Sequence, residues 1–169
     1  MNQRMSTQEF EEMYHNYKQI LFRIAFSYVK KREDAEDLVQ EAFFKCLYKA
    51  PDFADGEHEK RWLIRVMVNL SKNYVKSFWH RNRAKMEEVP EQSWNPEDRE
   101  ESLLQDVLEL PDQCKAPMYL HYYEGYTCRE VADILGCKES AIKMRLKKGR
   151  ELLKMTLTEG EMPYEDGGV

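Results

Sequence analysis

Apolar residues recur every three or four positions over most of the chain, which is the spacing of amphipathic helices. The first stripe begins at Phe10 and ends before the polar residues 30–32, which predicts one long helix. A second helix is expected to start at Asp34, a possible cap, and to stop before Ala50-Pro51. A loop over residues 51–59 then leads into a third helix. The predicted inward positions of these helices are Phe10, Met13, Tyr14, Tyr17, Ile20, Leu21, Ile24 and Tyr28; Ala35, Leu38, Val39, Ala42, Phe43, Cys46 and Leu47; and Leu63, Val66, Met67, Leu70, Tyr74 and Phe78.

A second group of helical patterns occupies the C-terminal part of the chain. A helix is predicted over residues 110–123, and residues 124–126 end it. Thr127 and Glu130 have the spacing of a capping box, which predicts the start of a short helix. Gly136 supplies the left-handed turn that ends this helix. The last predicted helix buries Ile142, Leu146, Gly149 and Leu153.

An acidic, proline-interrupted segment separates the two groups. Residues 85–109 contain nine acids and two bases, and Pro90 and Pro96 interrupt any early helix. The whole chain has only 7 Gly and 6 Pro among 169 residues, which favours helices over a turn-rich β-fold. We therefore predict an all-α protein with a helical bundle over residues 8–84, an acidic flexible linker over 85–97, a helix-turn-helix domain over 98–155 and a disordered tail over 156–169.

The net charge of −5 conceals two basic regions. Residues 60–85 contain eight Lys or Arg and no acid, and polar donors recur along one side of the third predicted helix. Such a face beside aromatic residues suits phosphate contacts and stacking on unpaired bases, although a solvated basic face over core aromatics explains the same pattern. The donors are Arg61, Arg65, Asn69, Lys72, Asn73 and Lys76.

The last predicted helix is the second basic region. Residues 138–154 contain seven Lys or Arg and two acids. Following a capping box and a short turn, this helix has the arrangement that offers donors to a DNA major groove. A plain two-helix hairpin is the alternative.

Several other classes of protein find no support in the sequence. The four cysteines include no C-x-x-C pair, the four histidines have no metal-site or nucleophile spacing, and no phosphate-binding loop motif occurs. We therefore expect neither a metal nor another cofactor, and no enzymatic activity. The N-terminus has no export signal and no run of eighteen apolar residues is present, so a cytoplasmic protein without membrane insertion is expected.

Three separate motifs resemble the extracytoplasmic-function (group IV) sigma factors of bacterial RNA polymerase. They are found in the expected order over residues 8–155, with a linker in the expected place. The first is DAEDLVQEAF at 34–43, and the second is RWLIRV at 61–66 with Asn69 and Asn73. The third combines GYT at 125–127, ADILG at 132–136 and AIKMRL at 141–146.

This resemblance implies a factor that directs promoter-specific transcription initiation, with a region 2-like and a region 4-like domain. Core RNA polymerase, promoter DNA and, for many members, an anti-sigma factor are the implied partners. Carried over to this chain, core polymerase is bound by Asp37, Gln40 and Glu41. The −10 element is recognised and melted by Phe53, Arg61, Arg65, Asn69, Lys72, Asn73 and Lys76, with Phe53 stacking on a flipped base. The −35 element is bound by Ser140, Lys143, Met144, Arg145, Lys147 and Arg150.

A different function is consistent with the same helix-turn-helix pattern. An autonomous regulator would bind duplex DNA without polymerase, usually as a dimer on two half-sites. A sigma factor would show promoter specificity mainly when bound to core polymerase.

Overall fold

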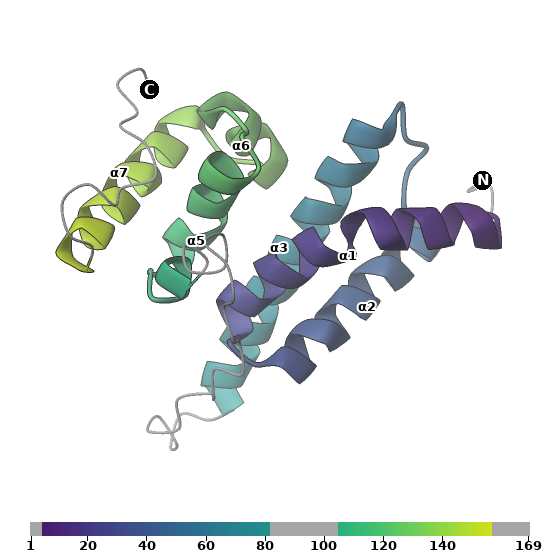
Figure 1. Ribbon diagram of the computed structural model, residues 1–169, viewed down its shortest axis with the longest axis horizontal. Helices are drawn as coiled ribbons and strands as arrows, with labels where there is room; N and C mark the ends of the chain where they lie inside the picture. The colour runs from purple at the N-terminus through teal and green to yellow at the C-terminus, as the bar shows by residue number, and fades with distance from the viewer. Residues whose placement is uncertain (1–4, 82–104, 157–169) are drawn as a thin grey trace. The chain divides into compact units, whose positions relative to one another are not determined.

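The computed structural model describes residues 5–81 and 105–156, and the regular elements in these ranges are all helical (Figure 1). This confirms the predicted all-α class. The chain divides into an N-terminal unit up to Trp94 and a C-terminal unit from Asn95, which we describe separately. The predicted linker at 85–97, and the predicted tail beyond Thr156, lie outside the described residues.

The N-terminal unit consists, in its described part, of α1 (Thr7–Val29), α2 (Arg32–Lys49) and α3 (Gly56–Arg81), and each of these helices packs against the other two. Each helix contributes one apolar side to a common core, so most of the predicted stripe is buried. The predicted inward residues that are only half-buried are Phe10, Tyr14, Tyr17, Ile20, Leu47, Val66, Tyr74 and Phe78. The largest fully buried side chains of this core are Phe26, Phe43, Leu21, Ile24, Leu63, Ile64 and Met67.

The start of α2 differs from the sequence prediction. The helix begins at Arg32, after Lys31, and no side chain caps it. Asp34, which we expected to be the cap, lies inside the first turn and accepts a hydrogen bond of 2.6 Å from the hydroxyl of Tyr74 on α3. A contact between residues forty positions apart therefore determines the role of this carboxylate.

The Asp34–Tyr74 contact predicts a loss of stability at high pH. Burial, together with the hydrogen bond to Asp34 and the charge of that carboxylate, raises the pKa of Tyr74 to about 12. In the unfolded chain this phenol ionises near 10. Between about pH 10 and 12 the folded state therefore binds more protons than the unfolded state, so the free energy of unfolding falls as the pH rises.

Tyr74→Phe should reduce the steepness of that fall, measured by urea unfolding at pH 9, 10 and 11. Tyr48→Phe is the matched control, because the Tyr48 side chain is 73% exposed. Equal pH dependence in the wild type and the Tyr74 variant would contradict the prediction.

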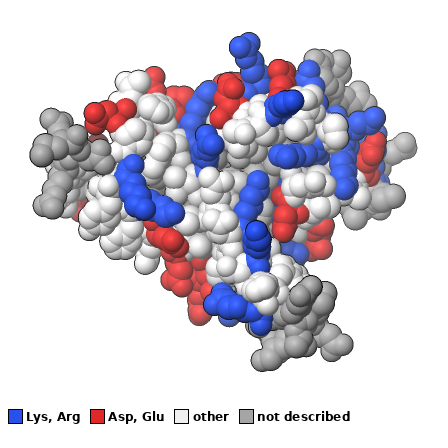
Figure 2. Space-filling view, turned by 180° about the vertical axis from the view of Figure 1, so that it is seen from behind, with Lys and Arg blue, Asp and Glu red and all other residues white. Residues whose placement is uncertain are grey.

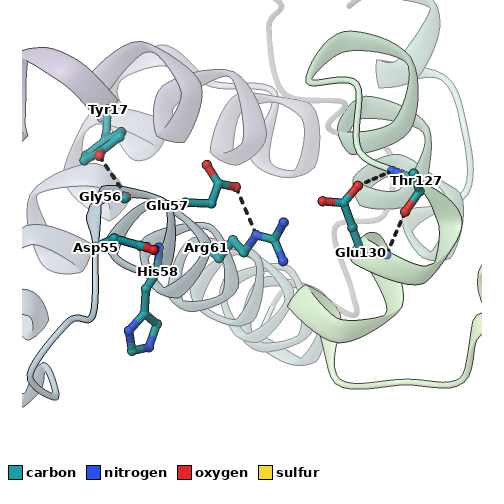
Figure 3. Close-up of polar contacts among 8 residues, drawn as sticks. All are labelled: Tyr17, Asp55, Gly56, Glu57, His58, Arg61, Thr127 and Glu130. Atoms are coloured by element: carbon teal, nitrogen blue, oxygen red, sulfur yellow. Dashed lines mark hydrogen bonds and ion pairs between the residues drawn. The ribbon is translucent and has the colours of Figure 1, made fainter.

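The described part of the C-terminal unit contains α5 (Asp112–Met118), the π-helix η1 (Tyr119–Tyr123), α6 (Cys128–Leu135) and α7 (Glu139–Thr156). Its core holds Leu108, Met118, Tyr119 and Leu120 together with the buried sides of α6 and α7. The predicted capping box is present: Thr127 Oγ1 accepts from the Glu130 N–H, and Glu130 Oε1 accepts from the Thr127 N–H, both at 3.1 Å (Figure 3). Gly136 ends α6 at φ 71°, as predicted.

The segment predicted as one helix over 110–123 is divided in the structure. Pro117 lies inside α5 and has no N–H for the carbonyl four residues earlier. The wider turns of η1 follow, in which the Glu124 N–H donates to the Tyr119 carbonyl at 3.3 Å. This change of register places the Tyr122 hydroxyl 3.0 Å from Nη1 of Arg150 on α7.

Gly149 allows α7 to pack closely on α5. A Cβ atom at this position would lie 2.7 Å from Sδ and 2.8 Å from Cγ of Met118, whose side chain is buried. Alanine improves helix propensity by about 1 kcal/mol, whereas overpacking a core costs about 1–3 kcal/mol. We therefore expect Gly149→Ala to destabilise the protein by about 1 kcal/mol in chemical denaturation.

A second substitution tests the cause of that loss. Met118→Ala creates space at the contact, so adding Gly149→Ala to that background should be neutral or stabilising. If Gly149→Ala had the same effect in both backgrounds, the contact with Met118 would not limit the residue at this position.

Candidate nucleic-acid and protein interfaces

The side of α2 that points away from the core carries polar and aromatic groups together. Asp37, Gln40 and Glu41 are exposed, as the sequence predicted. Phe44 and Tyr48 lie one and two turns further along the same side, 56% and 73% exposed. Their rings are parallel within 3°, with centroids 6.5 Å apart. We call these five residues the α2 outer face.

Phe44 and Tyr48 were not predicted to belong to a binding surface, although their spacing in the sequence indicates that they are exposed. The buried stripe of α2 includes Phe43 and Cys46. Two aromatic residues four positions apart and outside that stripe have to lie on the solvent side of the helix. Exposed aromatic residues beside acids are typical of protein interfaces, where aromatic side chains are enriched.

The side of α3 that points away from the core carries the predicted donors. Arg65, Asn69, Lys72, Asn73 and Lys76 are exposed and recur every three or four residues. The remaining predicted residue of this set is held differently. Arg61 is half-buried, and its Nε lies 2.9 Å from Oε1 of Glu57, one turn earlier (Figure 3).

Phe53 lies in the loop before α3 and contacts two rings of that helix. Its centroid is 5.2 Å from the ring of His58 and 5.8 Å from that of Trp62, and both contacts are edge-on. Trp62, Asn69 and Asn73 follow one another at helical spacing on the same side of α3. Aromatic rings at the start of α3 therefore lie on the same side as two amide side chains, and a flipped base requires both ring surface and donors for its edge.

The loop that carries Phe53 is held by hydrogen bonds among its neighbouring residues and by one from α1. The His58 N–H donates to Oδ1 of Asp55 at 2.8 Å (Figure 3). The Ala54 N–H donates to Nδ1 of His58 at 3.0 Å. The Tyr17 hydroxyl on α1 donates to the Gly56 carbonyl at 3.2 Å. The loop is shorter than predicted, because α3 begins at Gly56 instead of after Glu59.

Burial also affects the ionisation of the groups behind this loop. It raises the pKa of Glu59 above its usual value, while a hydrogen bond from Tyr17 acts in the opposite direction. The pKa of Tyr17 is raised by burial and by the nearby charges of Glu59 and Glu57. A neutral Tyr17 hydroxyl is therefore retained at ordinary pH, as its role as a hydrogen-bond donor requires.

In the C-terminal unit, α7 presents its predicted binding residues in two different ways. Ser140, Lys143, Met144 and Lys147 are exposed. Nζ of Lys143 lies 3.6 Å from Oε1 of Glu139, which is one turn earlier on the helix. The face drawn in Figure 2 shows Lys and Arg side chains in groups, with acidic side chains between them.

The two predicted arginines of α7 lie closer to the core. Arg145 is half-buried, and its Nη1 is 3.9 Å from Sγ of Cys137. Arg150 is half-buried too, and it donates to the Tyr122 hydroxyl. These contacts fix the position of both guanidinium groups beside the outer side of the helix.

No group of three or more His, Cys, Asp or Glu is placed to hold a metal ion within residues 5–81 and 105–156. Cys46 is buried with its Sγ 3.5 Å from Sδ of Met13, and burial raises its pKa to about 11. Among the described helices, none combines the length and apolar character needed to cross a membrane.

Comparison with known protein families matches each unit separately. Residues 13–81 match sigma-70 region 2, and residues 101–153 match sigma-70 region 4. These matches cover the α1–α3 bundle and the helix-turn-helix unit in that order. The residues of the α2 outer face, those of the α3 donor row (Arg65, Asn69, Lys72, Asn73 and Lys76) and the predicted binding residues of α7 all lie within them.

Curated relatives and solved structures agree with these matches. RNA polymerase sigma factor SigV of Bacillus subtilis (strain 168) is 28% identical, with 87% of this chain and 90% of that protein covered. ECF RNA polymerase sigma factor SigX of the same organism is 28% identical, with 95% and 94% covered.

The solved structures show the same fold. The sigma factor RpoE in complex with the anti-sigma factor NepR, from Bartonella quintana, has a TM-score of 0.71 at 21% identity, covering 91% of this chain and 99% of that one. CnrH in complex with the cytosolic domain of CnrY has a TM-score of 0.63 at 18% identity, covering 89% and 88%. The chain belongs to the sigma-70 family of RNA polymerase sigma factors, in its extracytoplasmic-function group.

Proposed function

We propose that this chain is an alternative sigma factor that binds core RNA polymerase and directs promoter-specific initiation. The observation that carries the proposal is that two helical units match sigma-70 regions 2 and 4 in order, each with an exposed polar face. In this function the chain acts as a recognition subunit without catalysis of its own, in the cytoplasm, where polymerase and promoter DNA are found. We assign residues 8–84 to core binding and the −10 element, 85–97 to a flexible linker, and 98–155 to the −35 element.

The α2 outer face is the surface that we assign to core polymerase. Asp37 and Glu41 supply negative charge, Gln40 supplies an amide, and the rings of Phe44 and Tyr48 supply apolar area beside them. Charge complementarity accelerates association and fixes register, while buried aromatic side chains provide most of the binding energy of an interface. The partner surface that fits this face is basic at one end and apolar at the other.

Promoter DNA is assigned to two separate surfaces. The α3 donor row and the Phe53 ring suit the unpaired −10 strand, because lysines and arginines neutralise phosphates while amides and aromatic rings contact bases. The outer side of α7 suits the major groove of the duplex −35 element. The predicted tail after 155 has no assigned role.

An anti-sigma factor belongs to the same proposal. One solved structure with this fold was determined in complex with the anti-sigma factor NepR, and another in complex with the cytosolic domain of CnrY. A protein inhibitor that covered the α2 outer face would prevent core binding by occupying the same aromatic and acidic side chains.

The decisive experiment compares DNA binding with and without core polymerase. A duplex pool with randomised −35 and −10 segments is selected with the full chain bound to the core polymerase of its own organism. The enriched duplex is then titrated with the chain alone and with the holoenzyme. We expect sequence preference mainly with the holoenzyme. Tight, specific binding by a dimer of the free chain would instead establish the autonomous regulator, which the sigma factor relatives do not favour.

A further inference from the structure

Met144 is an apolar side chain on the outer side of α7, in the N-terminal half of the helix. It is 72% exposed, although a large apolar side chain is usually buried. It follows the buried Ile142 by two residues and precedes the buried Leu146 by two. Two residues turn an α-helix by about 200°, so Met144 lies on the side opposite the core.

The neighbours of Met144 on the helix surface are polar and basic. Ser140 lies one turn before it, and Lys147 and Lys148 lie one turn after it, all exposed. Lysines in this position suit phosphates, which lie on both sides of a major groove. A thioether offers a phosphate no donor and no charge, so phosphate binding does not explain a methionine between these residues.

The chemistry of the major groove suggests what the side chain contacts. Among the base-pair edges displayed there, the C5-methyl group of thymine is the apolar feature. We infer that Met144 contacts the methyl group of a thymine in the −35 element, and so makes thymine the preferred base at that position. This inference rests on the proposed function, in which α7 enters the major groove.

The size of the effect follows from one buried methyl group. Burial of a CH₂-sized group corresponds to about a fourfold change in affinity. Replacing that thymine with deoxyuridine removes only the methyl group and retains every hydrogen-bonding group of the base. The substitution should therefore weaken wild-type holoenzyme binding by roughly three- to fivefold at this thymine.

The experiment uses the full chain bound to core polymerase and the duplex enriched from the random pool. Each thymine of the −35 segment is replaced in turn by deoxyuridine, and affinity is measured for the wild type and for Met144→Ala and Met144→Leu. We expect one thymine whose methyl group matters to the wild type and to Met144→Leu, but not to Met144→Ala. The salt dependence of binding should be unchanged in Met144→Ala and reduced in Lys148→Ala, because only the lysine carries a charge.

The possible outcomes distinguish the inference from the function on which it rests. If no thymine methyl group affects wild-type binding, or if deoxyuridine weakens the wild type and Met144→Ala equally, the inference is wrong while the proposed function stands. If the holoenzyme enriches no −35 sequence, both are wrong. Circular dichroism of the variants checks their folding, which should be normal because the side chain is exposed.

Discussion

Glu41→Lys and Phe44→Ala should each weaken the binding of this chain to core RNA polymerase by about 2–4 kcal/mol, which is roughly 30- to 1000-fold in affinity. Both side chains belong to the α2 outer face, and neither belongs to the core. The lysine places a positive charge against a partner surface that the acidic face predicts to be basic. The alanine removes an aromatic ring that is 56% exposed in the free chain and stacked on Tyr48.

The separation between binding and stability makes this prediction specific. Exposed substitutions outside structural contacts usually change stability by less than about 0.5 kcal/mol, so thermal unfolding of both variants should match the wild type. The affinity is measured by titrating labelled chain with core enzyme. Glu11→Lys is a matched control, because Glu11 is an exposed acid on α1. If Glu11→Lys weakens binding as much as Glu41→Lys does, the loss of affinity comes from a general charge effect and not from a specific contact of Glu41.

Local signals in the sequence predicted much of the fold. The stripes of apolar residues identified the helices of both units, and the Thr127 capping box and Gly136 gave the limits of α6. The same kind of signal at the first helix was overlooked. Ser6 and Glu9 form a capping box that starts α1 at Thr7, before the first stripe residue. These features depend on residues close together in sequence, so sequence reasoning can reach them.

Features that depend on distant residues could not be predicted in the same way. Asp34 has the chemistry of a cap, but the hydroxyl of Tyr74 engages its carboxylate across the bundle. Pro117 is compatible with several outcomes, and in the structure the wider turns of η1 follow it. At Asp34 a tertiary contact therefore overrides the local preference.

The same distinction applies to the candidate site. Spacing alone placed the donors of α3 and the exposed residues of α7 on one side of each helix. Spacing did not show that Arg150 donates a hydrogen bond to the Tyr122 hydroxyl, because the position of Tyr122 depends on the π-helical turns of η1. It also did not show that Phe53 lies against the rings of His58 and Trp62, since a loop has no periodicity from which to read side-chain direction.

Phe53→Ala should impair open-complex formation by about 1–3 kcal/mol, the contribution of one base stacked on an aromatic ring. Unstacking a base from the duplex costs a few kcal/mol, and the ring recovers part of that cost by receiving the flipped base. Binding of the duplex −35 element should be unaffected. Permanganate footprinting of promoter DNA with core enzyme measures strand opening. On promoter DNA whose −10 segment is already unpaired, Phe53→Ala should regain only the part of the lost activity that comes from melting the duplex.

The contacts of Phe53 within the protein require a control that separates stacking from packing. The ring is half-buried against His58 and Trp62, so its removal also loosens the loop. Phe53→Leu keeps much of the apolar volume without a flat ring, while Phe53→Tyr keeps the ring. If stacking matters, the leucine variant should open promoters as poorly as the alanine variant, and the tyrosine variant should open them nearly normally. Normal opening by Phe53→Ala would instead show that this loop only connects α2 to α3, because no base would then depend on the ring.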